Sequence, residues 1–364
     1  MDKTFDVVVI GGGQSGLAMG YYLRRTGLSF VILDDQKQPG GAWLHTWRSL
    51  RLFSPAQWSA LPGMLLTGGK DYPTRNDVIE YLKTYESKYT LPVRRPISVT
   101  GVSKEGEMFS IQTTQGVWFA KAVVNTTGSF SNPFIPEIEG QQVFKGQVLH
   151  SSQYRSPVAF ADKRVAVVGE GNSGAQILAE VSLITETLWI TQKEPRFLPD
   201  HIDGRYLFDA ATQMYEAQKT GTSYTPPSLG DIVMVDSVKD AKTRNVLNSK
   251  RPFERFTENS IVWADGHEEK IDVVIFCTGF GPALKHLSSL SLHAGDRKPA
   301  TEGTRSKTTD GLWFVGYGNW TGFASATLIG VGRSAKATVE EIVRYLSEKD
   351  KDKSYESTGK YALD

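Results

Sequence analysis

The chain has 364 residues, more than one ordinary hydrophobic core would need, so two domains are expected. Lys and Arg together number 41 and Asp and Glu 40, and this balance excludes the strong field that would attract nucleic acid or an anionic membrane. No apolar stretch reaches the roughly 20 residues of a membrane-spanning helix. Cys277 is the only cysteine, which excludes an internal disulfide or redox-active cysteine pair and makes the reducing cytoplasm the expected location.

Apolar periodicity and the placement of Gly and Pro predict the secondary structure in chain order. The expected elements are a strand over 5–10, a helix over 17–23, a strand over 30–33, irregular chain over 40–75, a helix over 77–88, strands over 93–127, a strand, helix and strand over 164–191, a hairpin near 262–266, buried strands over 271–276 and 312–316, and a helix from Ala324. The polar stretch 196–258 is expected to form helices and loops, and the charged tail 347–364 to fray.

Two segments place a G-x-G-x-x-G pattern between an apolar strand and a helix, at residues 11–16 and 169–174. Glycines let the backbone turn tightly and approach a pyrophosphate, and the following helix offers free N–H groups and its positive dipole end. We therefore expect one dinucleotide at each pattern, and we call them the first and the second cradle; a tight turn without a ligand is the alternative. The candidate binding residues are Gly11, Gly13, Gln14, Ser15 and Gly16 in the first cradle and Gly169, Gly171, Asn172, Ser173 and Gly174 in the second.

The residues that follow the next strand distinguish the two cradles. After the first cradle this strand ends at Asp34, whose carboxylate would accept hydrogen bonds from ribose hydroxyls. After the second cradle come Gln192, Lys193 and Arg196, where the cations favour the 2′-phosphate of NADPH and Gln192 can bond an unphosphorylated ribose. Lys lacks the bidentate fork of Arg, so we expect NADPH use with weak discrimination against NADH. A solvated surface charge is the alternative for Lys193.

Three further motifs contribute candidate site residues. Residues 40–43 read Gly-Gly-Ala-Trp, which would let the backbone lie flat against a large planar group beside Trp43; an ordinary loop with a core tryptophan is the alternative. Residues 144–154 read F-x-G-x-x-x-H-x-x-x-Y, with His150 in the middle. The chemistry of these residues by itself assigns this histidine no role. Residues 277–280 read Cys-Thr-Gly-Phe after a buried strand.

With these motifs, nearly the whole chain resembles the flavin-containing monooxygenases, the class B flavoprotein monooxygenases, and in particular short bacterial members with relaxed choice between NADH and NADPH. The stretch 144–154, lying between two cradles, matches the family fingerprint. The resemblance implies FAD in the first cradle and NAD(P)H in the second. It further implies FAD contacts from Gly41, Trp43, Thr127, Gly316 and Tyr317, and nicotinamide-nucleotide contacts from Thr278 and Gly279.

The chain also departs from the family pattern. Many members place an Asn beside the flavin after the Gly-Gly-x-Trp segment, whereas residues 52–58 contain none, so Phe53 or Ser54 are candidate substitutes. His150 is expected to help shape the nicotinamide site, with a structural histidine as the alternative. Baeyer–Villiger relatives usually follow the fingerprint His with Trp-Pro, and residues 154–156 read Tyr-Arg-Ser. This favours heteroatom oxygenation and leaves ketone oxidation open.

The resemblance implies an α/β fold with two Rossmann-like dinucleotide-binding domains, the NAD(P)H domain inserted into the FAD domain as in disulfide-reductase-like flavoproteins. Residues 1–152 and 283–364 would form the FAD domain, and 153–282 the NAD(P)H domain with an insertion at 196–258. NAD(P)H would reduce FAD, and O2 would then give a C(4a)-hydroperoxyflavin that oxygenates soft nucleophiles such as sulfides or amines. The alternative is an uncoupled NAD(P)H oxidase or a non-oxygenating flavin redox or regulatory protein. A small-molecule substrate, a homodimer as is common in the family, and no metal are the remaining expectations.

Overall fold

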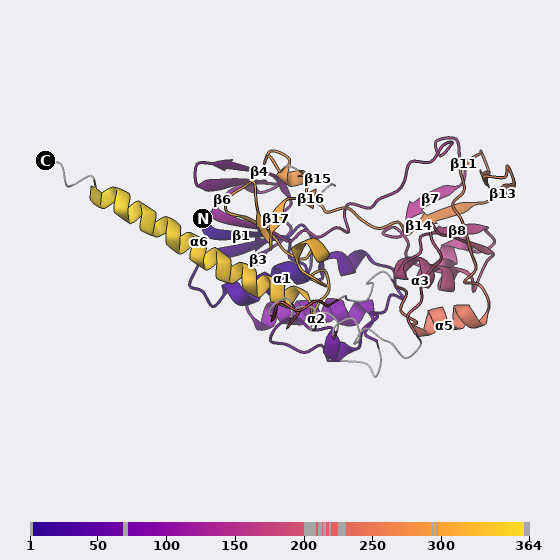
Figure 1. The fold of residues 1–364 in the computed structure, drawn as a ribbon, viewed down its shortest axis with the longest axis horizontal. Coiled ribbons are helices and arrows are strands. Elements are labelled where there is room, and N and C mark those ends of the chain that lie inside the picture. The colour runs from indigo at the N-terminus through magenta and orange to yellow at the C-terminus, as the bar shows by residue number, and fades with distance from the viewer. Residues whose placement is uncertain are drawn as a thin grey trace.

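The computed structural model describes residues 3–67, 72–199, 231–292 and 298–359, together with residues 209, 213, 216–217, 220–224 and 294–295. Two lobes lie side by side, the first around a nine-stranded sheet and the second around a five-stranded sheet (Figure 1). Strand, helix and parallel strand alternate at the centre of both sheets, which confirms the expected α/β class with two Rossmann-like units.

The first lobe carries its nine-stranded sheet with helices packed against it. Its main strand order is β17-β18-β19-β6-β1-β2-β3, and the β4–β5 hairpin extends β6. On β1, Val7 and Val9 face the core beneath α1 and α6, whereas Val8 and Ile10 face the core on the other side. Burial on both faces explains the uninterrupted apolar run of this strand. The bounds are β1 (Thr4–Ile10), α1 (Gln14–Leu23), β2 (Phe30–Leu33), α2 (Arg75–Lys88), β3 (Val93–Arg94), β4 (Val99–Glu105), β5 (Met108–Thr113), β6 (Gly116–Asn125), β17 (Thr301–Glu302), β18 (Arg305–Ser306), β19 (Leu312–Phe314) and α6 (Val331–Gly359).

The second lobe repeats the same unit on a smaller scale. Its strand order is β10-β9-β8-β14-β7, with all neighbours parallel. Its bounds are β7 (Gln147–His150), β8 (Val165–Val168), α3 (Asn172–Val181), β9 (Thr187–Ile190), α5 (Asp236–Thr243), β10 (Ser249–Lys250) and β14 (Val273–Phe276). A three-stranded sheet of β11 (Arg255–Phe256), β12 (Ser260–Val262) and β13 (Glu268–Lys270) covers it, and β15 (Ala294–Gly295) pairs with β16 (Lys298–Pro299) elsewhere. Short 3-10 helices are η1 (Gly41–His45), η2 (Ala56–Trp58), η3 (Pro157–Phe160), η4 (Lys285–Leu287) and η5 (Asn319–Thr321).

Several boundaries differ from the sequence-based expectations. Strand β7 pairs with β14, so residues 147–150 lie in the second sheet. The polar stretch 196–258, where it is described, contains the strands β10 and β11 in addition to α5. The last helix begins at Val331 instead of Ala324, because Ala324 has a φ of +57°, and it continues to Gly359 through the tail that was expected to fray.

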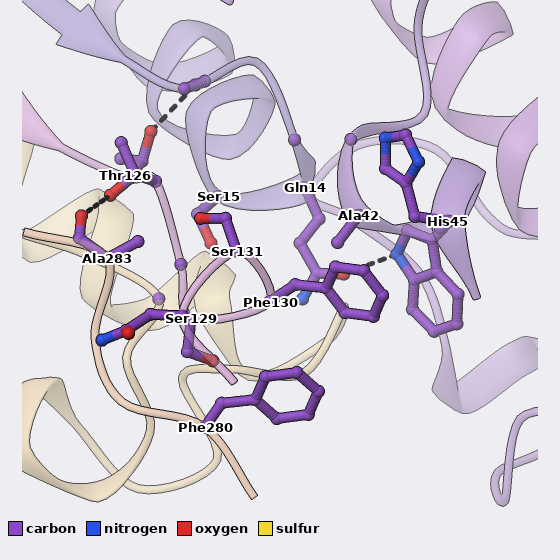
Figure 2. Close-up of a pocket in the computed structure, with 18 of the residues that line it drawn as sticks. Gln14, Ser15, Ala42, His45, Thr126, Ser129, Phe130, Ser131, Phe280 and Ala283 are labelled. Atoms are coloured by element: carbon purple, nitrogen blue, oxygen red, sulfur yellow. Dashed lines mark hydrogen bonds between the residues drawn. The ribbon is translucent and has the colours of Figure 1, made fainter. Parts of the chain in front are cut away.

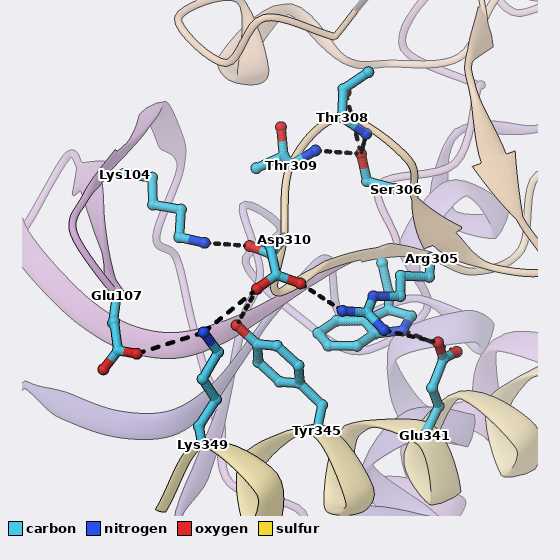
Figure 3. A network of polar contacts seen from close by, with 11 residues as sticks. Lys104, Glu107, Arg305, Ser306, Thr308, Thr309, Asp310, Glu341, Tyr345 and Lys349 are labelled. Atoms are coloured by element: carbon cyan, nitrogen blue, oxygen red, sulfur yellow. Dashed lines mark hydrogen bonds and ion pairs between the residues drawn. The ribbon is translucent and has the colours of Figure 1, made fainter. Parts of the chain in front are cut away.

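A polar network fastens α6 to the first lobe (Figure 3). Asp310 lies at its centre, where its Oδ1 accepts a 2.5 Å hydrogen bond from Arg305 and its Oδ2 accepts one of 3.1 Å from Tyr345 of α6. Lys104 of the β4–β5 hairpin donates to the carbonyl oxygen of Asp310 at 2.5 Å. Lys349 of α6 lies 3.5 Å from Glu107 of the same hairpin. Beyond these contacts the helix extends away from the lobe (Figure 1).

None of the helices in the described chain combines the length and the apolar character that crossing a membrane requires.

Candidate active site

A cavity of about 1320 Å³ lies where the two lobes meet, and both cradles contribute to its wall. The first lobe supplies residues 10–15, 33–36, 97–100 and 126–132, with parts of 41–53, and the second lobe supplies Ser151, Asn172, Ser173 and Gln176. The segment 282–286, with Phe280, Ser288, Gly316 and Ala326, completes it. This volume exceeds the roughly 300–1,000 Å³ of a site for one drug-sized ligand, as a site for two extended molecules requires.

Both cradles open into the cavity through a helix whose first turn has no side-chain cap. Helix α1 follows Gly13 and α3 follows Gly171, with neither a capping side chain nor an acidic residue in the first turn. Helix α2, by contrast, has a complete capping box from Thr74 and Asp77. The free N–H groups at the starts of α1 and α3 therefore remain for an anion. This difference fits two bound pyrophosphates.

The glycines of each cradle let two strand ends and a helix approach each other closely. A Cβ on Gly11 would lie 2.8 Å from the carbonyl oxygen of Thr126 at the end of β6, and one on Gly169 would lie 2.4 Å from that of Cys277 at the end of β14. A Cβ on Gly16 or Gly174 would in turn collide with the carbonyl of the first glycine of its own cradle, and these two glycines do not line the cavity. The close contact of helix and strand therefore requires glycine.

Asp34 lies at the cavity wall with one carboxylate oxygen already engaged. The Nε of Arg95 donates to its Oδ2 at 2.5 Å, and Nη1 of Arg95 donates to Glu86 at 2.6 Å. Asp34 is 3 % exposed, so its charge is balanced by this arginine instead of by water. Its other oxygen remains available to a ribose hydroxyl.

The wall beyond the first cradle is held by a chain of two hydrogen bonds. The indole N–H of Trp43 donates to Gln14 at 3.0 Å, and the amide of Gln14 donates to the carbonyl of Ala326 at 2.7 Å. Gly41 packs against the cradle so closely that a Cβ on it would lie 2.8 Å from the Cα of Gly13. A second turn comes equally close, because a Cβ on Gly316 would collide with the Ser15 side chain. All of these residues line the cavity.

A buried polar cluster lies behind this wall, at the ends of β6 and β19. The amide of Asn125 donates to the hydroxyl of Tyr317 at 2.6 Å, and Thr127 donates to the carbonyl of Ala283 at 2.7 Å. The Nε2 of His286 lies 2.8 Å from the Asn125 oxygen, and burial lowers the pKa of His286 to about 4. His286 is therefore neutral near pH 7. Thr127 and His286 line the cavity, whereas Tyr317, expected to contact FAD, does not.

An aromatic stack faces the cavity from both sides of the lobe junction. The rings of Phe130 and Phe280 are stacked with centroids 5.4 Å apart, and the ring of His45 stacks on Phe130 at 6.3 Å. Figure 2 shows these three rings together on one side of the cavity. Phe130 follows the end of β6 in the first lobe and Phe280 follows β14 in the second, so the stack joins the two lobes. Phe280 is 37 % exposed.

The chain segments that connect the lobes run beside each other at this stack. Ala283 N–H donates to the carbonyl of Gly128 at 2.9 Å, Gly281 N–H to that of Asn132 at 2.9 Å, and Phe134 N–H to that of Gly279 at 3.0 Å. The rings of Phe130 and Phe280 are therefore held by a short antiparallel ladder between the two connections.

The three expected positioning residues lie in different surroundings. Phe53 lines the cavity, in a segment whose Ser49 donates to Glu180 of the second lobe. Ser54 does not line it, because it is 4 % exposed and its hydroxyl bonds that of Ser59 at 2.7 Å. Of the two candidate substitutes for the missing asparagine, Phe53 lines the cavity and Ser54 does not.

His150 is fully buried and also lies outside the cavity wall. Ser152 N–H donates to its Nδ1 at 3.1 Å, so Nε2 carries the proton and donates to the carbonyl of Gly279 at 2.9 Å. Burial lowers the pKa of His150, which keeps this neutral form. The ring packs edge-on against Phe280 with centroids 4.7 Å apart. His150 thus contacts the aromatic stack from behind.

The remaining residues expected at the nicotinamide dinucleotide lie outside the cavity wall. Gln192, Lys193 and Arg196 are exposed after the end of β9. Thr278 donates to the carbonyl of Phe134 in the connecting ladder, and Gly279 accepts from His150. Gly169 and Gly171 belong to the second cradle, whose wall contacts come from Asn172 and Ser173.

Sequence patterns did not single out several residues of this site. Arg95 and His286 reach it from segments with no motif, and only the folded chain brings them next to Asp34 and Asn125. Phe130 had a detectable signal, because Thr-Gly at 127–128 is followed closely by Phe, as Thr-Gly at 278–279 is.

Comparison with known proteins places this geometry in a family. Residues 8–203 match the family of the pyridine nucleotide-disulphide oxidoreductases. Two solved structures of a flavin-containing monooxygenase from Stenotrophomonas maltophilia, one of them a double mutant, are 48% identical to the chain, with TM-scores of 0.87 and 0.88. Each alignment covers 95% of this chain and 100% of the other. The chain belongs to the flavin-containing monooxygenase family.

More distant relatives agree with this placement. An uncharacterized CzcO-like oxidoreductase of Geobacillus kaustophilus is 32% identical to this chain, and the alignment covers 95% of this chain and 100% of the relative. The indole-3-pyruvate monooxygenase YUCCA4 of Oryza sativa subsp. japonica is 26% identical, and its alignment covers 95% of this chain and 90% of the relative. The monooxygenase is therefore a flavin-dependent oxidoreductase whose relatives imply a flavin, NAD(P)H and O2.

Burial raises the pKa of its single thiol, Cys277, to about 12, so this cysteine stays protonated near neutral pH.

Proposed function

We propose that the monooxygenase binds FAD along the first cradle and a nicotinamide dinucleotide, NADPH or NADH, at the second, and that it transfers one oxygen atom of O2 to a soft nucleophile such as a thioether sulfur. The observation that carries this proposal is the shared cavity, into which the uncapped starts of α1 and α3 both open. Two dinucleotides held there would meet end to end, as transfer of a hydride between them requires.

Residues of the first lobe would hold FAD by its polar groups. The N–H groups at the start of α1 would bind the pyrophosphate, and the free oxygen of Asp34 would accept a ribose hydroxyl. Gly41 packs closely against Gly13, and Trp43 borders the same wall. When bound, FAD would accept the hydride and activate O2, while the chain orients it.

Aromatic residues would keep water away from the reacting groups. Phe130 and Phe280 form an apolar stack at the lobe junction, and Phe53 lines the cavity nearby. Exclusion of water would protect an oxygen-transferring state from decay to peroxide. His150 would act as a positioning residue, because it packs on Phe280 and holds the carbonyl of Gly279.

Two titratable side chains of the cavity wall are already engaged by other residues of the chain. One oxygen of Asp34 is occupied by Arg95, and His286 is neutral and bonded to Asn125. Attack by a thioether sulfur requires no proton removal by the protein, so this wall suits sulfides better than substrates that need a strong base. Neutral amines likewise need no proton removal by the protein. Ketones are the substrate class to be compared with sulfides and amines.

Turnover with a substrate panel tests the proposal. FAD-loaded protein should oxidise NADPH and NADH and convert aryl alkyl sulfides to sulfoxides, with one product for each nicotinamide oxidised and little peroxide. Phe280→Ala should raise the peroxide fraction severalfold without loss of FAD, whereas Leu183→Ala, at an exposed position of the second lobe, should not. Stoichiometric peroxide with no oxygenated sulfide, amine or ketone would instead identify an oxidase.

A further inference from the structure

The two cradles are built in the same hydrogen-bond register. The Gly11 N–H donates to the carbonyl of Leu33 at 2.7 Å, and the Gly169 N–H donates to that of Ile190 at 2.8 Å. The end of β2 therefore corresponds, residue for residue, to the end of β9. Each cradle can serve as an internal reference for the other.

This register equates Thr191 with Asp34. Asp34 N–H donates to the carbonyl of Arg94 on β3 at 3.1 Å, and Thr191 N–H donates to that of Lys250 on β10 at 3.0 Å. The second cradle therefore carries a neutral hydroxyl where the first carries its ribose carboxylate, and Thr191 is 1 % exposed.

In each cradle, the residue between the first two glycines, Gly12 or Glu170, lies next to the position of Asp34 or Thr191. A Cβ on Gly12 would lie 2.7 Å from the Cβ of Asp34, so a side chain at the middle position would occupy the ribose carboxylate's place. In the second cradle the middle residue is Glu170, and its Oε2 accepts the Gln192 N–H at 3.3 Å. The carboxylate missing from the end of β9 is thus supplied by the cradle itself.

The charges around this carboxylate leave it uncompensated. The neighbouring guanidinium of Arg251 bonds Thr191 at 3.0 Å and pairs with Glu194 at 2.5 Å. Within the described part of the chain, no Lys or Arg forms an ion pair with Glu170, which is half-buried. Lys193 extends from an exposed position. The carboxyl group of Glu170 therefore stands next to the expected ribose without a paired cation among the described residues.

We propose that Glu170 is a specificity-determining residue that favours NADH over NADPH. Its carboxylate would accept hydrogen bonds from the ribose hydroxyls of NADH and would repel a 2′-phosphate. Lys193 and Arg196 act in the opposite direction from solvent, where a charge is screened more strongly than beside the half-buried Glu170. This inference rests on the proposed function of the second cradle, and it predicts weak discrimination between NADH and NADPH as the sum of two opposed charges.

Isothermal titration of FAD-loaded protein with NAD⁺ and with NADP⁺ tests this role without turnover. Glu170→Gln removes the charge and keeps an oxygen that can accept the Gln192 N–H. We expect it to lower the Kd for NADP⁺ by about five- to tenfold and to raise that for NAD⁺ by about two- to threefold. Glu186→Gln is the matched control. Glu186 directly precedes β9, at the opposite end of this strand from Gln192, and its side chain is 80 % exposed and pairs with Arg164. Glu186→Gln changes the net charge equally and should leave the ratio of the two Kd values within about twofold of wild type.

Each outcome decides a different statement. A Kd ratio that moves in Glu170→Gln by no more than in Glu186→Gln overturns the role of Glu170 and leaves the proposed function standing. Wild-type protein that binds neither NAD⁺ nor NADP⁺ overturns the function of the second cradle, and the role of Glu170 with it. The absorbance of bound FAD monitors folding in every variant.

Discussion

The guanidinium of Arg95 contacts the carboxylate of Asp34 behind the first cradle, with Nε 2.5 Å from Oδ2. The same guanidinium binds Glu86 at 2.6 Å, and the second oxygen of Glu86 is buried without a hydrogen-bond partner. Both side chains of the Arg95–Asp34 pair are at most 10 % exposed. One cation therefore pairs with two carboxylates where FAD is expected to bind.

Replacing Arg95 should weaken both folding and FAD binding. Arg95→Met leaves two carboxylates without their cation, so we expect the free energy of unfolding to fall by about 3 kcal/mol. FAD affinity should fall by about tenfold, because Asp34 loses the contact that orients it. Urea unfolding and titration of apoprotein with FAD measure the two effects. Arg94→Met, at the exposed neighbouring position, is the control; an equal loss of FAD affinity there would contradict the role of Arg95.

His286 should make folding weaken in mild acid. Burial lowers its pKa to about 4 in the folded protein, against about 6.5 in the unfolded chain. The unfolded chain therefore binds more protons between these values, and stability is full above pH 6.5 and is lost as the pH falls toward 4, by at most about 3 kcal/mol.

Urea unfolding between pH 7.5 and 4.5 tests this linkage. Carboxylates contribute to the acid sensitivity of wild type and of His286→Gln alike. The difference in stability loss between the two therefore measures the contribution of the histidine. We expect the variant to lose less stability over this range than wild type. His267→Gln, at an exposed position, should follow the wild-type curve. Parallel curves for wild type and His286→Gln would show that His286 is not held neutral.

The network around Asp310 should stabilise the docking of α6 (Figure 3). Asp310→Ala removes the acceptor of Arg305 and Tyr345, and because the network is partly exposed we expect a loss of about 1–2 kcal/mol in urea unfolding. Glu340→Ala removes an exposed pair with Lys336 within the same helix and should cost less than about 0.5 kcal/mol. Equal losses would mean that the network contributes no more than an ordinary surface pair.

Lys193 should affect NADPH more than NADH. Lys193→Ala removes an exposed cation near the expected 2′-phosphate, and we expect the Kd for NADP⁺ to rise by about two- to threefold while that for NAD⁺ stays within error. Isothermal titration gives both values. An equal change in the two constants would contradict a contact between Lys193 and the phosphate.

The two cradles were readable from sequence because their signals are local. A strand, three glycines and a helix lie within a few residues, and Asp34 follows at the end of the next strand. The same locality explains why most helices and strands were predicted at nearly correct places. The start of α6 was wrong because the positive φ of Ala324 depends on its surroundings, which no periodicity reveals.

The partners of the site residues were not readable, because they come from distant parts of the chain. Arg95 reaches Asp34 across 61 residues and His286 reaches Asn125 across 161. The orientation of Ser54 toward Ser59 was not readable for a different reason, because it follows from local turns that carry no motif. Glu170 was visible in the sequence, but only the shared register of the cradles gives its carboxylate a meaning.

Isotope labelling tests the central claim most directly. FAD-loaded protein would turn over an aryl alkyl sulfide with NADH or NADPH under ¹⁸O2 in unlabelled water, and mass spectrometry would follow the sulfoxide. The account predicts a sulfoxide with one ¹⁸O atom, formed in step with nicotinamide oxidation. Nicotinamide oxidation that yields only labelled peroxide, with no ¹⁸O in a sulfide, amine or ketone product, would contradict it.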